Sequence, residues 1–159
     1  MNIALRAKWC WRYGQEGNDL WKSIIESKYG GGDQNWWPRS VSMSYDKAFW
    51  KGIMNSYPKF KENISCRLGD GNRVRFWLDV WVGSETLKMR FPYIFNVSNN
   101  KLGIVSSMGT QAGADITWNF QFRRSLYDWE HAQLVELLSL LANTSFNDHQ
   151  DSWRWLGNS

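Results

Sequence analysis

The chain has 159 residues, of which 43% are hydrophobic and 21% charged, ordinary proportions for a soluble globular domain with a buried core. No apolar run reaches the ~20 residues that a membrane-spanning helix needs, and Arg6, Lys8 and Arg12 interrupt the segment where a signal peptide would lie. We therefore expect an intracellular protein with no membrane partner. The sequence does not choose between nucleus and cytoplasm.

The charge of the chain is unevenly distributed, although its net value is only +4. Residues 1–100 carry fifteen lysines and arginines against nine acidic residues, whereas residues 101–159 carry four against six. A basic region of this kind is compatible with a polyanion such as RNA or DNA as a partner. An ordinary, slightly basic domain shows the same balance, so charge alone leaves both interpretations open.

Cysteine and tryptophan usage carries further information. Cys10 and Cys66 lie far apart, and neither has a neighbouring cysteine or a pair of histidines, so we expect two buried free thiols and no zinc site. The sequence also contains twelve tryptophans. At ~200 Å² each, their rings represent on the order of 2,400 Å² of mostly apolar surface. This surface predicts a strongly aromatic core, with some rings turned toward a neighbouring molecule.

Helical patterns dominate the N-terminal part of the chain. The hydrophobic spacing predicts helices over residues 3–13 and 19–28, the second of which should stop at Gly30. A third helix is expected from about residue 44 to about residue 57, where Pro58 should interrupt it.

The C-terminal part combines one strand pattern with one helix pattern. Apolar and polar residues alternate strictly over residues 116–123, which predicts a half-buried strand. A leucine-rich amphipathic helix is expected over about 127–142, with Ser125 and Asp128 as its capping pair. Residues 151–155 resemble the beginning of another element that is cut off.

Residues 64–82 predict a β-hairpin around a Gly-Asp-Gly-Asn turn, because every even position outside the turn is apolar. A two-residue loop would mix the polar and apolar faces, so we expect a three-residue loop, Asp70 to Asn72. The expected cross-strand pairs are Leu68 with Val74, Cys66 with Phe76, and Ile64 with Leu78.

The odd-numbered face of this hairpin is the candidate nucleic-acid contact. The predicted register places Arg67 opposite Arg75, a like-charge pair that costs roughly 0.2–1 kcal/mol unless an anion or a ring relieves it. A phosphate backbone would relieve the repulsion, and a tryptophan on the same face could stack on an unpaired base. Alternatively, the arginines pair with carboxylates and stack on that ring within the protein. The candidate contact residues are Arg67, Arg73, Arg75, Trp77 and, on the third helix, Lys51.

Short motifs follow one another along nearly the whole chain. They include Lys8-Trp9, Trp11-Arg12-Tyr13, Phe49-Trp50-Lys51, Gly69-Asp70-Gly71, Val74-Arg75-Phe76-Trp77, Asp79-Val80-Trp81, Arg90-Phe91-Pro92, Asp128-Trp129-Glu130 and Asp151-Ser152-Trp153-Arg154-Trp155. Their order resembles a region of plant LINE-type (non-LTR) retrotransposon reverse transcriptases. That region lies between the polymerase domain and the zinc-binding reverse-transcriptase-associated segment.

The resemblance implies a parent protein with a polymerase domain upstream and a Cys/His-rich segment downstream, both absent from this sequence. The chain has no Asp-Asp pair for two-metal nucleotidyl transfer, and its only histidines are His131 and His149. Polymerase, endonuclease and ribonuclease H motifs are likewise absent. We therefore expect no enzyme activity, no catalytic or metal-binding residues and no cofactor.

Together these observations predict an α+β fold, mainly helical, with a short antiparallel hairpin near residues 64–82 and a C-terminal amphipathic helix. Three segments, 1–62, 63–124 and 125–159, are expected to form one compact unit. The expected function is that of a truncated, non-catalytic fragment of a retrotransposon reverse-transcriptase-like protein, an accessory region that contacts RNA or DNA. The alternative is a retroelement remnant with a purely structural role, or no function as a free chain.

Overall fold

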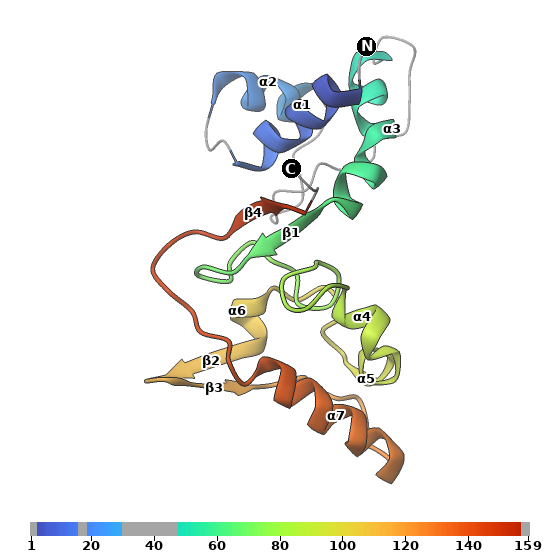
Figure 1. Ribbon diagram of the computed structural model, residues 1–159, viewed down its shortest axis with the longest axis vertical. Helices are drawn as coiled ribbons and strands as arrows, with labels where there is room; N and C mark the ends of the chain where they lie inside the picture. Colours follow the sequence, from blue (N-terminus) through green and yellow to red (C-terminus); the bar gives the residue numbers. More distant parts are fainter. Residues whose placement is uncertain (1–2, 16–18, 30–47, 157–159) are drawn as a thin grey trace. The chain divides into compact units, whose positions relative to one another are not determined.

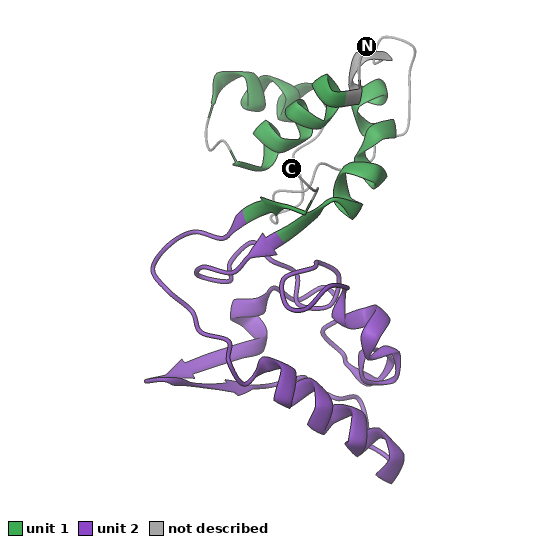
Figure 2. Ribbon diagram, in the orientation of Figure 1, with its two compact units in different colours: residues 1–65, 153–159 green, residues 66–152 purple. Residues whose placement is uncertain are grey.

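The computed structural model describes residues 3–15, 19–29 and 48–156, with the helices and strands labelled in Figure 1. The α+β class expected from the sequence is confirmed. The chain divides into two compact units, residues 1–65 with 153–159 and residues 66–152 (Figure 2). Residues 153–155 of the C-terminal strand belong to the first unit, and Ser152 belongs to the second. Among the described helices, none is long and apolar enough to cross a membrane.

Unit 1 contains three helices, α1 (Ile3–Gln15), α2 (Leu20–Tyr29) and α3 (Ala48–Glu62). The first two match the helices expected from hydrophobic spacing. The third begins within the described residues at Ala48, and the expected start near residue 44 lies outside them. The expected interruption at Pro58 is wrong, because α3 continues through the proline to Glu62. The buried Phe60 explains this continuation, since its packing offsets the hydrogen bond that proline cannot donate.

Aromatic and cationic contacts join α2 to α1. The guanidinium carbon of Arg12 lies 5.4 Å from the ring centre of Trp9 and 5.3 Å from that of Trp21. The two indole rings meet edge to face at 5.4 Å. The hydroxyl of Tyr13 donates a hydrogen bond of 3.2 Å to Glu26. These contacts show that several of the tryptophans hold unit 1 together.

The core of unit 1 lies between α1, α3 and the C-terminal strand. α1 packs against α3. The ring of Trp153 lies directly against Gly14, leaving no room there for a Cβ atom. Both cysteines are buried free thiols, as expected, and burial raises the pKa of the Cys10 thiol to about 11. The fully or nearly buried side chains of this core are Cys10, Tyr13, Ile53, Phe60, Ile64 and Trp153.

The element expected at residues 151–155 is a strand that pairs within the chain. Strand β4 (Ser152–Trp155) pairs with β1 (Ile64–Arg67). The pairing extends past the strand end, where the Leu156 N–H donates to the Asn63 carbonyl oxygen at 2.8 Å. The strand was not recognisable as such because its pairing partner lies far away in the sequence.

Unit 2 is built from short elements and one longer helix. The elements are α4 (Leu87–Arg90), α5 (Pro92–Val97), α6 (Val105–Met108), β2 (Gly109–Ala112), β3 (Asp115–Trp118) and α7 (Asp128–Leu141). Helix α5 packs against both α4 and α7, and α6 packs against β2. The buried apolar side chains of unit 2 include Val74, Phe76, Trp77, Leu87, Phe91, Ile94, Val105, Met108, Phe120, Leu137 and Leu141.

The strand expected over residues 116–123 is present but shorter. β3 pairs with β2 in antiparallel register, with Gly109 opposite Trp118 and Ala112 opposite Asp115. The chain leaves the strand after Trp118, and Gln121 adopts φ 48°, a backbone conformation that ends regular extension. The alternation in burial nevertheless persists to the buried Phe120.

Helix α7 matches the expected amphipathic helix, whereas its cap differs from the expected pair. The cap residue is Tyr127, two positions beyond Ser125. The Tyr127 N–H donates to the Glu130 carboxylate at 2.9 Å. Glu130 supplies the side-chain half of a capping box at this N-terminus, which explains why Ser125 is not used.

Candidate nucleic-acid interface

Residues 64–67 of the segment expected to form the hairpin are strand β1, which pairs with β4, and residues 69–79 form bends and turns. The predicted hairpin and its register are therefore wrong. The Phe76 N–H donates to the Gly103 carbonyl at 2.9 Å, and the Val105 N–H donates to the Val74 carbonyl at 2.9 Å. Residues 74–76 therefore pair with residues 103–105. The Cys66 N–H donates to the Val80 carbonyl at 2.6 Å, so the expected Cys66–Phe76 pair does not form.

The carboxylate of Asp151 holds the Gly-Asp-Gly loop. One oxygen accepts hydrogen bonds from the backbone N–H groups of Gly69 (2.6 Å) and Gly71 (2.9 Å). The other oxygen accepts from Arg73 (2.8 Å) and Val74 (3.2 Å). Asp151 is only 3% exposed, so these four donors replace the water that the charge would otherwise require. The loop resembles an anion-binding nest, but the protein's own carboxylate occupies it.

Each of the two glycines in this loop is required for a different steric reason. A Cβ atom on Gly69 would collide with the backbone carbonyl of His149. Gly71 adopts φ 74°, a left-handed conformation that side chains other than glycine adopt only at a cost. The Gly-Asp-Gly motif and the Asp151 motif therefore form one structural unit, although they lie 80 residues or more apart in sequence.

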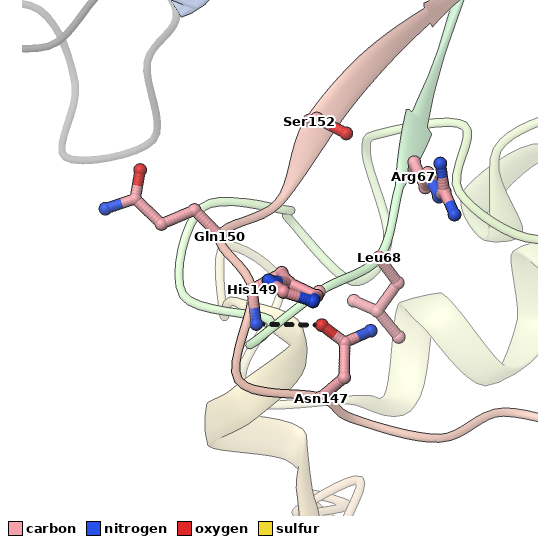
Figure 3. Close-up of a pocket in the computed structure, with 7 residues that line it drawn as sticks. Arg67, Leu68, Asn147, His149, Gln150 and Ser152 are labelled. Carbon is pink, nitrogen blue, oxygen red and sulfur yellow. Dashed lines mark hydrogen bonds between the residues drawn. The ribbon is translucent and has the colours of Figure 1, made fainter.

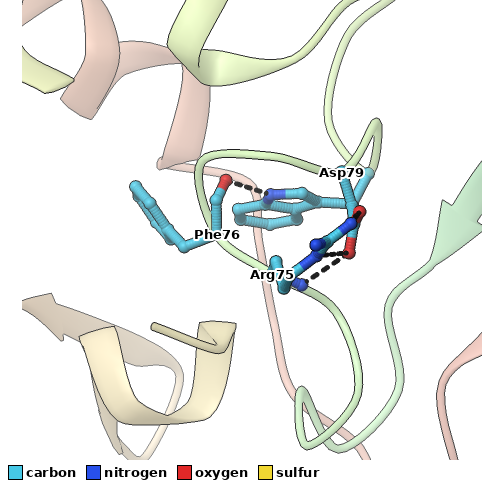
Figure 4. A network of polar contacts seen from close by, with 4 residues as sticks. Arg75, Phe76 and Asp79 are labelled. Atoms are coloured by element: carbon cyan, nitrogen blue, oxygen red, sulfur yellow. Dashed lines mark hydrogen bonds and ion pairs between the residues drawn. The ribbon is translucent and has the colours of Figure 1, made fainter. Parts of the chain in front are cut away.

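Arg75 and Asp79 form a second buried network (Figure 4). The Asp79 carboxylate accepts the Arg75 backbone N–H at 2.8 Å and the guanidinium at 2.9 Å. The Trp81 indole N–H donates to the Phe76 carbonyl at 2.9 Å. The expected repulsion between Arg67 and Arg75 is therefore absent, because the second arginine is neutralised within its own turn.

The structure places Trp77 in the core of unit 2, with 0% of its surface exposed. Its ring packs edge to face on Phe76 at 4.9 Å and on Phe95 at 5.7 Å. The expected position on an open hairpin face is wrong. The reason is that residues 76–78 turn, so the alternation of an extended strand no longer decides which way each side chain points.

Arg67 remains exposed and lines a polar pocket of about 180 Å³ (Figure 3). One wall of the pocket is formed by Asn147, His149, Gln150 and Ser152. The Asn147 N–H donates a hydrogen bond of 3.1 Å to the Gly69 carbonyl on the opposite wall. The side chain of Asn147 in turn accepts the His149 N–H at 2.9 Å. Sequence reasoning missed this wall, although the Asp151 motif beside it was a signal of local order.

The other two candidate residues are placed differently. Arg73 is half-buried, and its backbone N–H is one of the donors to Asp151. Lys51 is exposed on α3 and belongs to unit 1. Unit 2 therefore contains four of the candidate contact residues, and of these only Arg67 is exposed. The other three are Arg73, Arg75 and Trp77.

Glu130 is the third buried carboxylate of unit 2. The guanidinium of Arg124 donates to it twice, each time at 2.8 Å. These two bonds, assisted by the Tyr127 N–H, lower the pKa of Glu130 to about 2 against the opposing effect of burial. All the carboxylates buried in the described residues, Asp79, Glu130 and Asp151, thus have structural partners.

The Glu130 pKa predicts an acid-dependent loss of stability. Because the folded pKa is lower than the ordinary value of 4.5, the stabilisation is complete above that pH and is lost as pH falls toward 2. Glu130→Gln should therefore flatten the decrease in melting temperature over this range. Glu136→Gln, at an exposed carboxylate paired with Arg90, is the matched control. Melts that fall equally steeply in wild type and Glu130→Gln would contradict the assignment.

Within the part of the chain that the structure describes, no three histidine, cysteine or acidic side chains gather to hold a metal ion. No family model and no solved structure matches the chain. The chain is similar to an Arabidopsis thaliana protein named "Putative ribonuclease H protein", with 34% identity over 91 residues. The match covers 55% of this chain and 14% of that protein, so it spans only a small part of the relative's length.

Proposed function

We propose that this chain is a non-catalytic accessory region of a retroelement-derived protein, and that it contacts single-stranded RNA or DNA through exposed basic side chains. The observation that carries the proposal is that the two carboxylates of the sequence motifs, Asp79 and Asp151, have structural roles. Asp79 and Asp151 are buried and saturated with hydrogen bonds from Arg75 and from backbone N–H groups. Groups held in this way stabilise a fold and are poorly placed to bind catalytic metal ions.

Two similarities support the retroelement origin. The order of motifs resembles the region downstream of the polymerase domain in plant LINE-type reverse transcriptases. The Arabidopsis relative, named for ribonuclease H, supports a retroelement-type source more generally. We propose that this chain corresponds to the accessory region between the polymerase and zinc-binding segments, because the order of its motifs resembles that region.

Nucleic-acid contact is favoured by the two candidate residues that are exposed, Arg67 in unit 2 and Lys51 in unit 1. Binding through such residues is electrostatic, indifferent to sequence and strongly dependent on salt. The other candidate function is a purely structural remnant. It is favoured by the burial of Trp77 and the pairing of Arg75 with Asp79.

Arg67→Ala should lower the log–log salt slope of single-strand binding by about 0.7, the share of one phosphate contact. The measurement is a titration of a labelled oligonucleotide at several salt concentrations. Arg90→Ala is the matched control, because this exposed arginine of unit 2 is already paired with Glu136 at 3.1 Å. A wild-type affinity that does not change with salt would favour the structural remnant.

An RNA–DNA hybrid incubated with protein and magnesium should remain intact. Cleavage that survives repurification would overturn the non-catalytic assignment.

A further inference from the structure

Unit 1 has an aromatic groove of about 300 Å³, lined by Ala4, Ala7, Lys8, Trp11, Phe60 and Trp155. The first four residues share one face of α1, since they recur at helical spacing. Phe60 belongs to α3 and Trp155 to β4. Three elements of the same unit therefore converge on this groove.

The lining is suited to a flat ring. The Phe60 and Trp155 rings lie 6.1 Å apart at an interplanar angle of 44°, and Trp155 is 47% exposed. The two alanines have side chains too short to fill the space beside them, which keeps the groove open. Lys8 is exposed at the same groove and supplies a positive charge. The volume lies at the lower end of the ~300–1,000 Å³ range of ligand pockets.

The net charge of unit 1 makes it a better partner for a polyanion than unit 2. The sequence of unit 1 contains eleven lysines and arginines against six acidic residues, a net charge of +5. Unit 2 contains eight against nine, a net charge of −1. Aromatic rings beside a positive surface are the combination by which proteins bind single-stranded nucleic acids without sequence preference.

We infer that the groove of unit 1 binds one unpaired nucleobase of a single strand, with Trp155 and Trp11 stacking on the base and Lys8 contacting the adjacent phosphate. This inference rests on the proposed function and moves its centre from the 64–82 segment to unit 1. A protein segment is the other possible occupant of an aromatic groove, but a positive unit with a lysine at the lining favours the polynucleotide.

The experiment compares a labelled oligo-dT strand with an abasic strand of the same length and charge, both bound to the full chain. Wild-type protein should bind oligo-dT about 5- to 100-fold more tightly, as expected for loss of base stacking at one site. Trp155→Ala should remove this preference and leave abasic-strand affinity unchanged, because stacking releases no counterions. Leu156→Ala, at a neighbouring apolar residue that is 44% exposed and does not line the groove, should keep the preference.

Lys8→Gln should weaken binding of both strands and lower the salt slope by about 0.7. Lys59→Gln makes the same charge change in unit 1 at an exposed position outside the groove, and it should have a smaller effect. Equal wild-type affinity for both strands would overturn the groove assignment while leaving the proposed function standing. Absence of binding to either strand at low salt would overturn both. If Trp155→Ala reduced self-association in sedimentation without changing either affinity, the groove would be a protein contact and the inference would be wrong.

Discussion

Asp151→Ala should unfold unit 2, or reduce its free energy of unfolding by more than about 4 kcal/mol. The substitution removes the acceptor of four backbone N–H groups, on Gly69, Gly71, Arg73 and Val74. Each buried donor left without a partner costs roughly 1–3 kcal/mol, and a domain has only about 5–15 kcal/mol of net stability in total. Urea unfolding followed by tryptophan fluorescence measures the change.

Two further variants show whether the carboxylate itself is responsible. Asp151→Asn keeps one acceptor oxygen but turns an NH₂ group toward two backbone donors, so it should also be strongly destabilised. Asp148→Ala removes an exposed carboxylate from the same segment, and its effect should stay within about 0.5 kcal/mol. An Asp151→Ala protein with wild-type unfolding would show that the loop holds its conformation without this carboxylate.

Trp77→Ala should lower the free energy of unfolding by about 3–5 kcal/mol, the usual cost of removing a large buried aromatic side chain. The ring is fully buried and packs on Phe76 and Phe95. Its indole N–H finds no acceptor among the described residues, so Trp77→Phe forfeits no hydrogen bond and should cost clearly less. Thermal and urea melts of the two variants distinguish packing from polar effects.

The control for Trp77 is a tryptophan on the surface of the same unit. Trp129 of α7 is 54% exposed, so Trp129→Ala should change stability much less than Trp77→Ala. Oligonucleotide binding by Trp77→Ala should decline only in proportion to the unfolded fraction. If Trp77→Ala kept wild-type stability but lost single-strand binding, the buried position of Trp77 would be contradicted, and the surface position that the alternating pattern predicted would be supported.

The sequence by itself determined the elements whose evidence is local. Helices α1, α2 and α7 follow from apolar residues at helical spacing, and the burial of Phe120 follows from strict alternation. Buried free thiols were likewise predictable. These features depend on residues within a few turns of one another, so the pattern contains the necessary information.

Pro58 and Ser125 show where a local rule yields to packing. The proline alone predicts a helix end, but the buried Phe60 two residues later favours continuation of α3. Ser125 is a good cap in isolation, whereas Glu130 pairs with Arg124 and places the cap at Tyr127. The burial of Phe60 depends on the tertiary environment, which helix propensity does not describe. The contacts that set the cap are local, since Glu130 lies six residues from Arg124 and three from Tyr127, but a capping rule that considers Ser125 alone does not include them.

Only the tertiary structure decided what residues 64–82 form. Alternation correctly marked Val74 and Phe76 as buried, but it does not state which segment pairs with them. Residues 74–76 pair with residues 103–105, and the loop before them is held by Asp151, which lies 82 residues beyond Gly69 and accepts its N–H group. The groove proposed in unit 1 is likewise built from segments that lie far apart in the sequence, α1, α3 and β4. A hydrogen bond across such a distance leaves no periodic signal in the sequence, because only folding brings its two partners together.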